Sequence, residues 1–324
     1  MLFQKVRDDR NLQKHRIGSG GRVKNALKWL TLFLILAMTS ACSGFGIGGK
    51  QITVGGKNFT EQYLLSEMTG FLLTEEGFTV KQMNNLGSTV VRTALKNEQV
   101  DMMWEYTGTA LITYMGAEPI ADPQKAFQKV KKLDAKRGIH WMNMSQVNNT
   151  YALVMNSDQA NELGIKTISD LAAYVKEHPG ELTMASDAEF ANRPDGLPGV
   201  EEKYGFEFGP GQIKQMELGL TQRALNNGQV DVSVAFETDA TIKAYDLVVL
   251  EDDRQFFPPY RAAVAINQEV YEKYPEIKEI TKPLAVKLNS DIMRELNYKV
   301  DVEGKSVSVV AHEWLVENGL LNND

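Results

Sequence analysis

Four aromatic residues have the chemistry and the positions needed to hold an organic cation. Tyr106 and Phe236 occupy equivalent places in two similar segments, each after a predicted strand, and Tyr151 and Tyr260 each open an apolar segment. Aromatic faces attract a cation by about 0.5–2 kcal/mol per ring, depending on desolvation. A quaternary ammonium fits such rings because it has no N–H group to donate. We therefore expect the four rings to converge on a quaternary ammonium; the alternative is ordinary core or rim packing of each ring.

An internal repeat explains why these rings should converge. Residues 91–110 (VRTALKNEQVDMMWEYTGTA) align with residues 221–240 (TQRALNNGQVDVSVAFETDA) at an offset of 130, with seven identical positions. Two shorter segments find counterparts in the same order, namely residues 52–54 with 182–184 and residues 80–83 with 213–216. Each unit has the pattern strand, helix, strand, helix, strand, which predicts parallel β-α-β units with covered sheets. The chain should therefore form two similar α/β lobes.

The helices of each unit have recognisable ends. The second helices should end near Asn97 and Asn227, and a third strand should follow each Gln-Val-Asp. The first helix should start near Asn58, because Asn58 and Glu61 have the spacing of a capping box. One apolar face is expected on this helix, formed by Tyr63, Leu64, Met68, Phe71 and Leu72.

Two apolar segments outside the repeat are expected to join the lobes. Residues 151–156 and 260–267 have strand character and lie just beyond the two repeat units. As crossing strands, the first carries the chain into lobe two and the second returns it to lobe one, where the last helix should stop at Gly319. The expected fold is an α/β two-lobed clamshell with two hinge strands. Its expected boundaries are residues 51–150 plus 261–324 for lobe one and residues 151–260 for lobe two.

Lys57 is a candidate for binding a carboxylate. Ligands of open α/β sheets bind outside the carboxyl ends of the strands. Lys57 follows the first predicted strand and directly precedes the predicted first helix. The free N–H groups at a helix N-terminus favour negative charge, and the lysine adds a cation beside them. A ligand that carries both an ammonium and a carboxylate would suit this arrangement.

The N-terminal region has the features of a secretory signal. Residues 1–28 contain eight Lys or Arg and two Asp, and a mostly apolar run follows at residues 29–38. A run this short does not span a bilayer of about 30 Å, but it matches the apolar core of a signal peptide. Thr39-Ser40-Ala41-Cys42 resembles a bacterial lipobox, although Thr39 stands where Leu is usual.

The single cysteine of the chain is thus expected to carry a lipid. We predict a signal peptide with a lipobox at residues 1–41, a lipid on Cys42, and a tether at residues 42–50. The mature protein would then be lipid-anchored at the extracytoplasmic face of the bacterial cell membrane. The alternative is a buried or free thiol at Cys42. One cysteine excludes a disulfide within the chain.

Composition and motifs argue against several other classes of protein. The chain has 42 acidic and 35 basic residues and a formal charge of −7, so it should not attract nucleic acid. Beyond the signal, His140, His178 and His312 lie far apart without metal-ligand spacing, and no catalytic motif is present. We expect no metal, no cofactor and no catalysis. One alternative is an enzyme whose acid/base pair comes from Glu105, Glu237 and Asp239, which otherwise form the rim of the cleft.

Several short segments resemble one known family. These are residues 54–61 (VGGKNFTE), 105–109 (EYTGT), 148–151 (NNTY), 238–240 (TDA) and 256–260 (FFPPY). They resemble the glycine betaine/choline-binding proteins of osmoprotectant ABC transporters, and the resemblance covers about residues 50 to 322. It implies a type II substrate-binding protein that captures glycine betaine, proline betaine, choline or carnitine. It also implies delivery of the ligand to a membrane permease that is driven by a separate ATPase.

The resemblance assigns roles to individual residues. It implies an aromatic cage of Tyr106, Tyr151, Phe236 and Tyr260, with Phe236 in place of the tyrosine that is common in the family. It implies that a carboxylate is bound by Lys57, Thr109 and Arg193, and that Asn149 makes a polar main-chain contact near the methyl groups. The alternative for Arg193 is a solvated loop arginine.

Lys57 is expected to decide between ligands. Choline ends in a neutral hydroxyl, so closing the cleft over it should leave one or two buried cations unpaired, which is costly. We therefore predict that the protein prefers glycine betaine or a related betaine to choline. Replacing Lys57 by Ala should weaken betaine binding far more than choline binding. A binding protein for choline, carnitine, an amino acid or another cation remains an alternative on the same fold.

Overall fold

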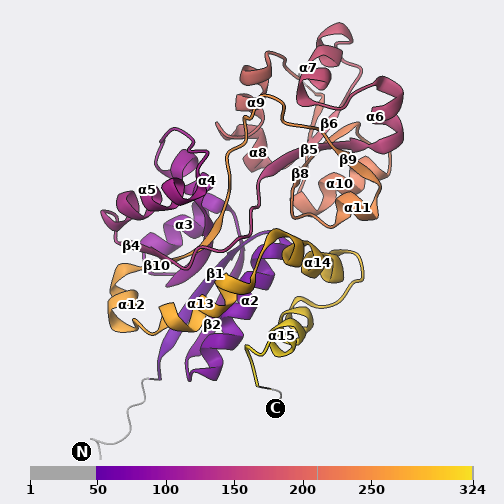
Figure 1. Cartoon of the computed structure of the whole chain (residues 1–324). Coiled ribbons are helices and arrows are strands. Elements are labelled where there is room, and N and C mark those ends of the chain that lie inside the picture. The colour runs from indigo at the N-terminus through magenta and orange to yellow at the C-terminus, as the bar shows by residue number, and fades with distance from the viewer. Residues whose placement is uncertain (1–48, 210, 323–324) are drawn as a thin grey trace, which may run out of the picture. The chain divides into compact units, whose positions relative to one another are not determined.

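The computed structural model describes residues 49–209 and 211–322 (Figure 1). The predicted signal peptide and the lipid attachment at Cys42 lie outside these residues. Within the two described ranges, no helix has the length and apolar character needed to cross a membrane. The fold that follows is therefore that of the segment beginning at Gly49.

The first sheet has five strands in the order β2-β1-β3-β10-β4. These strands are β1 (Gln51–Lys57), β2 (Thr79–Leu86), β3 (Met102–Tyr106), β4 (Ile139–Met142) and β10 (Ala262–Asn267). β1 pairs in parallel with β2 and β3, whereas β10 pairs antiparallel with β3 and β4. The three parallel strands belong to the first repeat unit.

The second sheet repeats this arrangement in the order β7-β6-β8-β5-β9. Its strands are β5 (Tyr151–Asn156), β6 (Met184–Ser186), β7 (Ile213–Gln215), β8 (Val232–Phe236) and β9 (Leu247–Val249). β6 pairs in parallel with β7 and β8, and β5 pairs antiparallel with β8 and β9. The internal repeat is thereby confirmed, since β3 and β8 occupy the same central place and lie 130 residues apart.

Two of the strands from outside the repeat lie beside the central strands of the two sheets. β5 enters the second sheet beside β8, and β10 returns to the first sheet beside β3, as Figure 1 shows. The chain therefore has the predicted two-lobed α/β fold with two crossing strands.

Helices cover both sheets. Around the first sheet lie α2 (Thr60–Glu75), α3 (Ser88–Lys96), α4 (Thr107–Thr109), the π-helix η1 (Ala110–Tyr114), α5 (Pro123–Ala135), α12 (Gln268–Lys273), α13 (Ile277–Lys287), α14 (Ser290–Asp301) and α15 (Val307–Glu317). Around the second lie α6 (Ser157–Leu163), α7 (Ile168–Glu177), α8 (Ala188–Asn192), α9 (Leu197–Tyr204), α10 (Leu218–Asn226) and α11 (Thr241–Ala244). The predicted helix ends at Asn97 and Asn227 are confirmed as the caps of α3 and α10, and Gly319 follows α15 with φ of 64°.

α2 starts near Asn58 as predicted, but the predicted capping box was wrong. Phe59, not Asn58, is its N-cap residue, and no side chain caps the helix. Glu61 does not reach back to the backbone as a capping box requires; its carboxylate accepts a hydrogen bond from the Tyr106 hydroxyl at 2.6 Å. The physical reason is burial: Glu61 faces the interior of the lobe, where a buried carboxyl group requires hydrogen-bond donors.

The buried face of α2 also differs from the prediction. Leu64, Met68 and Leu72 are buried as expected, whereas Tyr63 and Phe71 are only half-buried. Leu65 and Leu73 are buried in addition. α2 contacts the strands β1 and β2 and also the helices α13, α14 and α15. It therefore buries a wider apolar face than a helix that packs against a sheet alone, and this face includes the residues that follow Leu64 and Leu72.

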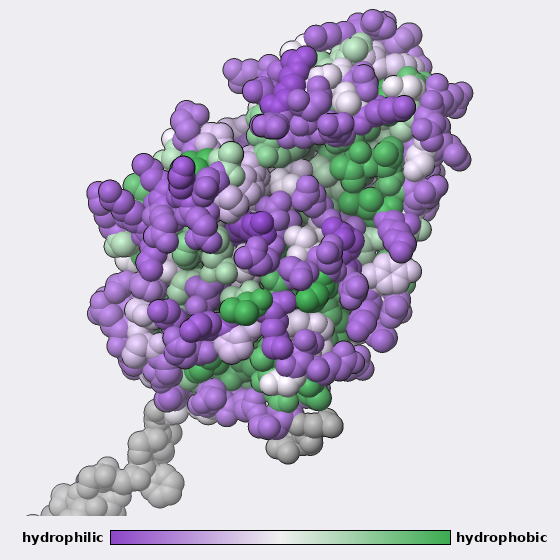
Figure 2. Space-filling model, in the orientation of Figure 1, coloured by the Kyte–Doolittle hydropathy of each residue, from purple (hydrophilic) through white to green (hydrophobic). Residues whose placement is uncertain are grey.

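One hydrophobic cluster connects the interiors of the two lobes. It runs from Val54 and Leu64 of the first lobe to Leu153 and Leu171 of the second. The four aromatic rings predicted for the cage belong to this cluster. In Figure 2, hydrophilic residues cover most of the face shown, with smaller hydrophobic patches between them. The rings therefore lie in the interior, where the two lobes meet.

Candidate functional site

The strand ends bring the four predicted rings together. Tyr106 ends β3 and Phe236 ends β8, at equivalent places in the two sheets. Tyr151 begins β5 directly opposite Phe236, and Tyr260 lies two residues before β10. All four rings are buried. Gly108 is needed for this arrangement, because a Cβ at that position would lie 2.6 Å from the Tyr260 ring.

All eight residues predicted for the ligand site line one small cavity. They are Lys57, Tyr106, Thr109, Asn149, Tyr151, Arg193, Phe236 and Tyr260. The cavity has a volume of about 20 Å³, which is room for about one water molecule. The rings contact one another directly: the Tyr151 centroid lies 5.0 Å from Phe236 and 5.8 Å from Tyr260. A trimethylammonium group can enter this site only if the rings move apart.

A fifth ring belongs to the same cluster and was missed from the sequence. Phe59 stacks on Phe236, with centroids 5.2 Å apart, and on Tyr106, with centroids 6.2 Å apart. It lines the cavity together with the four predicted rings. As the N-cap residue of α2 it lies outside the helical periodicity. The available signal was its place two residues after Lys57, within the strand-to-helix turn.

Lys57 ends β1 as a buried cation with a buried partner. Its ammonium group lies 2.5 Å from Glu105 Oε1, and both side chains are almost fully buried. Glu105 also accepts hydrogen bonds from the Tyr114 hydroxyl at 2.9 Å and from the Tyr106 backbone N–H at 2.7 Å. The lysine Nζ lies 4.8 Å from the centroid of the Tyr106 ring. Lys57 thus reaches the cage while it is paired with a carboxylate.

Arg193 has the same relation to Asp195. It follows α8 directly, and its guanidinium donates to both oxygens of Asp195, from Nε at 2.9 Å and from Nη2 at 2.5 Å. Nη2 also lies 3.5 Å from the Thr109 hydroxyl of the other lobe, and Asp195 accepts from the Tyr260 hydroxyl at 2.6 Å. Because Arg193 is buried, its interpretation as a solvated loop arginine is excluded.

The two ion pairs correct the electrostatic argument made from the sequence. Choline was expected to leave one or two buried cations unpaired, but Lys57 and Arg193 each already have a buried carboxylate. Glu105 was assigned to the rim of the cleft, and it is fully buried inside it. Asp195 was not recognised as part of the site. Both cations are therefore neutralised by the protein before any ligand is considered.

Glu61 and Asn149 form the wall behind the Tyr106 ring. Glu61 Oε1 accepts hydrogen bonds from the Tyr106 hydroxyl at 2.6 Å and from the Asn149 side-chain amide at 2.8 Å. Burial raises the pKa of Glu61, and these two hydrogen bonds offset part of that rise. Burial also raises the pKa of the Tyr106 hydroxyl well above its ordinary value, and the neighbouring Glu61 raises it further. Tyr106 therefore stays protonated and donates its hydrogen bond at any physiological pH.

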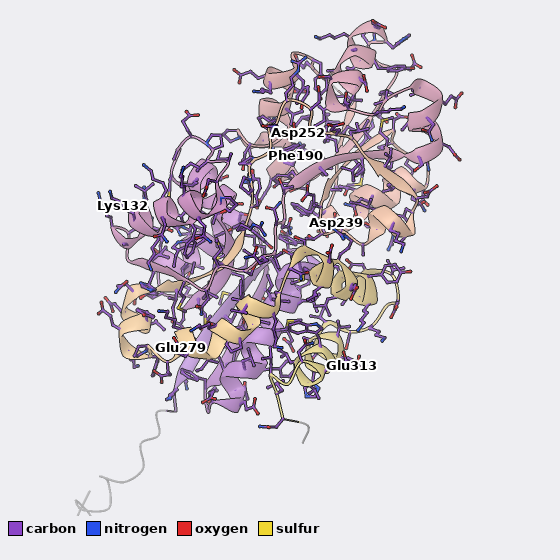
Figure 3. The ribbon with its side chains drawn as sticks, viewed as in Figure 1. Lys132, Phe190, Asp239, Asp252, Glu279 and Glu313 are labelled. Atoms are coloured by element: carbon purple, nitrogen blue, oxygen red, sulfur yellow. The ribbon has the colours of Figure 1, made fainter. Side chains whose placement is uncertain are left out.

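A larger cavity of about 250 Å³ adjoins this wall. It shares Phe59, Asn149 and Phe236 with the small cavity, and its other lining residues include acidic side chains from both lobes: Glu61, Glu217, Asp239 and Asp301. Asp239 lies on the side of the second lobe that faces α14 (Figure 3). The surroundings of the cage are consequently rich in carboxylates.

The acids proposed for a catalytic pair each have separate partners. Glu105 pairs with Lys57, the exposed Glu237 accepts from the Asn148 amide at 3.2 Å, and Asp239 accepts from the Phe236 backbone N–H at 2.8 Å. Among residues 49–209 and 211–322, no group of His, Cys, Asp and Glu is arranged to hold a metal ion. The arrangement can bind a cation between rings and can offer cationic donors to a carboxylate.

A two-lobed α/β fold with such a site between its lobes is typical of solute-binding proteins of the clamshell type. The family described as "Substrate binding domain of ABC-type glycine betaine transport system" matches residues 50–317, and the chain belongs to that family. It is the substrate-binding component of an ABC transport system.

Relatives and solved structures agree with this assignment. The chain is 39% identical to the glycine-betaine-binding protein of Pseudomonas aeruginosa over 299 residues, covering 90% of this chain and 96% of the relative. It is 36% identical to the carnitine transport binding protein OpuCC of Listeria monocytogenes over 305 residues, covering 90% and 97%. A crystal structure described as a glycine betaine/carnitine/choline ABC transporter matches with a TM-score of 0.66 and 33% identity, covering 84% and 100%.

Phe59 should contribute to ligand binding as a fifth ring. Replacing Phe59 by Leu removes one π face and retains an apolar side chain, so affinity for a trimethylammonium ligand should fall by about 2- to 30-fold, equivalent to about 0.5–2 kcal/mol. Isothermal titration calorimetry with glycine betaine and with choline measures this change. Phe71→Leu is a matched control on the same helix, because Phe71 packs edge-on against His312 instead of a cage ring. Unchanged affinity in Phe59→Leu would show that this ring is not part of the cage.

Proposed function

We propose that this protein captures a trimethylammonium zwitterion, glycine betaine or a related betaine, and delivers it to the permease of its transporter. The observation that carries the proposal is the convergence of five aromatic rings with two cationic side chains on one buried site between the lobes. The rings suit the ammonium group. The carboxylate would be bound by Lys57, Thr109 and Arg193, with Asn149 beside the methyl groups. The printed names of the relatives support ligands of this chemistry.

Hydrogen-bond capacity supports carboxylate binding despite the two internal ion pairs. An ammonium group has three N–H donors, and Lys57 uses one of them for Glu105. Among the residues that the structure describes, the Nη1 group of Arg193 has only a distant carboxylate, Glu189, at 3.6 Å. Donors therefore remain for a ligand carboxylate, but no buried cation is left without a counter-charge when the ligand, like choline, has no carboxylate. The expected preference for betaine over choline is smaller than unpaired cations would have produced.

A ligand panel tests the proposal. We expect purified protein to bind glycine betaine about tenfold more tightly than choline, since one or two charge-assisted hydrogen bonds contribute about 1–2 kcal/mol here. Proline betaine and carnitine extend the comparison. Calorimetry gives the affinities, and a ligand-dependent rise in melting temperature without conversion of the ligand would indicate binding and no catalysis.

Two outcomes of the panel would change the assignment. Equal or tighter binding of choline or carnitine would identify that compound as the preferred ligand of the same site. This is the main alternative, because Lys57 and Arg193 are each paired with a carboxylate and do not require one from the ligand. An amino-acid ligand, or turnover of any compound in the panel, would overturn the proposal. We infer that the protein binds its ligand without chemical change, in keeping with the transport role of its family.

Attachment to the membrane is proposed on sequence grounds. Cys42 would carry the lipid, with residues 1–41 removed as a signal peptide and residues 42–50 as the tether. The protein would then act at the outer face of the cell membrane, next to the permease. We propose lobe boundaries after residues 150 and 260, where the chain passes between the two sheets.

A further inference from the structure

Glu61 is a buried carboxyl group to which the proposed function assigns no contact with the ligand. Its side chain is 2% exposed and lies in the first turn of α2. Oε1 accepts hydrogen bonds from the Tyr106 hydroxyl and the Asn149 amide. Within residues 49–209 and 211–322, neither Oε2 nor the hydroxyl of neighbouring Thr238 makes a hydrogen bond of good geometry, although Thr238 lies near enough to lower the pKa of Glu61. Placing a carboxyl group here without full hydrogen bonding is costly, which calls for a compensating interaction.

The groups that face Glu61 come from four other elements. They are Lys57 at the end of β1, Tyr106 at the end of β3, Asn149 before β5, and Thr238 with Asp239 after β8. Lys57 is the nearest cation, but its ammonium group is bound to Glu105. Asp239 lines the same 250 Å³ cavity as Glu61 and adds a second acid. The fixed charges around the rear of the cage are therefore negative on balance.

The two hydrogen bonds of Glu61 connect it to both parts of the site. Tyr106 supplies a cage ring from the first lobe. Asn149 lies in the segment that leads into β5 and lines both cavities. One carboxylate oxygen thus fixes a ring and a rim residue at the same time. The Tyr106 side chain, which is hydrogen-bonded to Glu61, lies between this carboxylate and the cage. The protein interior screens charges weakly, so the carboxylate can attract a cation in the cage.

We propose that the Glu61 carboxylate is the buried counter-charge of the ammonium group in the cage, and that Glu61 also positions Tyr106 and Asn149. This inference rests on the proposed function, since it concerns the same site. The ligand's positive charge supplies the counter-charge that Glu61 lacks, since its protein neighbours give it hydrogen bonds but Lys57 is paired with Glu105. Lys57 and Arg193, by contrast, are compensated internally and act as hydrogen-bond donors to the opposite end of the ligand.

The proposal links ligand binding to a proton. Burial raises the pKa of Glu61, so a fraction of the free protein carries a proton there. A cation in the cage favours the carboxylate and lowers this pKa, so binding releases a proton. Affinity should then be highest at high pH and should fall as the pH is lowered through the pKa of the free protein. Burial also raises the pKa of the half-buried Asp239, to about 7, so Asp239 is a second acid whose titration can affect binding.

Glu61→Gln with a pair of isosteric ligands tests the counter-charge. Glycine betaine carries a trimethylammonium group, and 3,3-dimethylbutanoate has the same shape and carboxylate with a carbon in place of the charged nitrogen. In Glu61→Gln, betaine should bind about tenfold more weakly, whereas the carbon isostere should bind equally or more tightly because a repulsive charge is gone. Glu67→Gln, half-buried on the same helix, is the control and should change neither affinity.

A pH series separates Glu61 from Asp239. Betaine affinity of the wild type should fall as the pH is lowered through the raised pKa of Glu61, and this dependence should be much weaker in Glu61→Gln. Asp239→Asn should retain the part of the pH dependence that comes from the titration of Glu61. A pH profile of this kind would not follow from a purely structural role, because loss of packing would weaken both ligands at every pH.

Each outcome decides the question. Parallel weakening of betaine and its carbon isostere in Glu61→Gln, or equal pH profiles for variant and wild type, would overturn the counter-charge. If the variant does not fold, calorimetry of the wild type in two buffers with different ionisation enthalpies measures proton release on betaine binding: release supports the proposal, and its absence overturns it. Failure of the wild type to bind any trimethylammonium ligand would instead overturn the proposed function, and this inference with it.

Discussion

Replacing Tyr151 by Ala should lower the free energy of unfolding by about 3–5 kcal/mol and eliminate measurable binding of trimethylammonium ligands. Tyr151 is buried at the centre of the ring cluster, with centroid distances of 4.9 Å to Phe190, 5.0 Å to Phe236 and 5.8 Å to Tyr260. Removing its ring creates a cavity where the apolar interiors of the two lobes join. It also removes one cage face and loosens two others.

A matched variant separates the ring from the hydroxyl group. The Tyr151 hydroxyl forms no hydrogen bond with the residues that the structure describes, so Tyr151→Phe should change stability by less than about 1.5 kcal/mol. Its ligand affinity should stay close to that of the wild type. Urea denaturation and calorimetry measure both variants. Tight betaine binding by Tyr151→Ala would show that this ring does not line the ligand site.

The repeat explains how the aromatic part of the site could be predicted from the sequence. Tyr106 and Phe236 align at an offset of 130, and the structure places them at the ends of the central parallel strands β3 and β8. Tyr151 pairs with Phe236 on the neighbouring strand of the second sheet. In the first sheet, Tyr260 lies two residues before Ala262, which pairs with Tyr106. The positions of the strand ends follow from the repeated order of strands and helices along the chain, and this order can be predicted from the sequence.

The charged part of the site was harder to predict, for physical reasons. Glu105 lies on a strand that is covered on both faces, so the alternation of apolar and polar residues does not reveal where its side chain points. Asp195 lies in the turn between α8 and α9, and its partner Arg193 is two residues away along the chain. Glu61 has the spacing of a capping box and is instead hydrogen-bonded to a residue 45 positions away. Each of these positions depends on tertiary packing.

The ion pairs give the cage a division of roles. Asp195 neutralises Arg193 and also accepts from the Tyr260 hydroxyl, and Glu105 neutralises Lys57 and accepts from the Tyr114 hydroxyl. Each carboxylate therefore fixes both a cation and a phenol. Such pairs contribute little net stability compared with apolar packing. Removing one partner nevertheless lowers the stability of the fold, because it leaves the other charge buried and unpaired. Under the proposed function, we therefore expect ligand selectivity to depend on the orientation of donors more than on uncompensated charge.

Replacing Lys57 by Ala should therefore act on stability as well as on selectivity. The change leaves Glu105 buried with hydrogen-bond donors but without a counter-charge, which should lower the free energy of unfolding by about 3–5 kcal/mol. Betaine should bind about 10- to 100-fold more weakly, because its carboxylate loses a charge-assisted donor and meets the unpaired Glu105. Choline should lose little affinity, since the freed carboxylate attracts its ammonium group.

The double variant Lys57→Met/Glu105→Gln isolates the ion pair from the ligand contact. Removing both charges should restore most of the lost stability, because a buried pair replaced by neutral side chains of similar size costs little. Betaine binding should remain weak in the double variant, since the donor for its carboxylate is still absent. Denaturation curves and titrations with both ligands complete the cycle. A parallel loss of betaine and choline affinity in the single variant would contradict the assignment of Lys57 to the carboxylate, and an unrestored stability would contradict its pairing with Glu105.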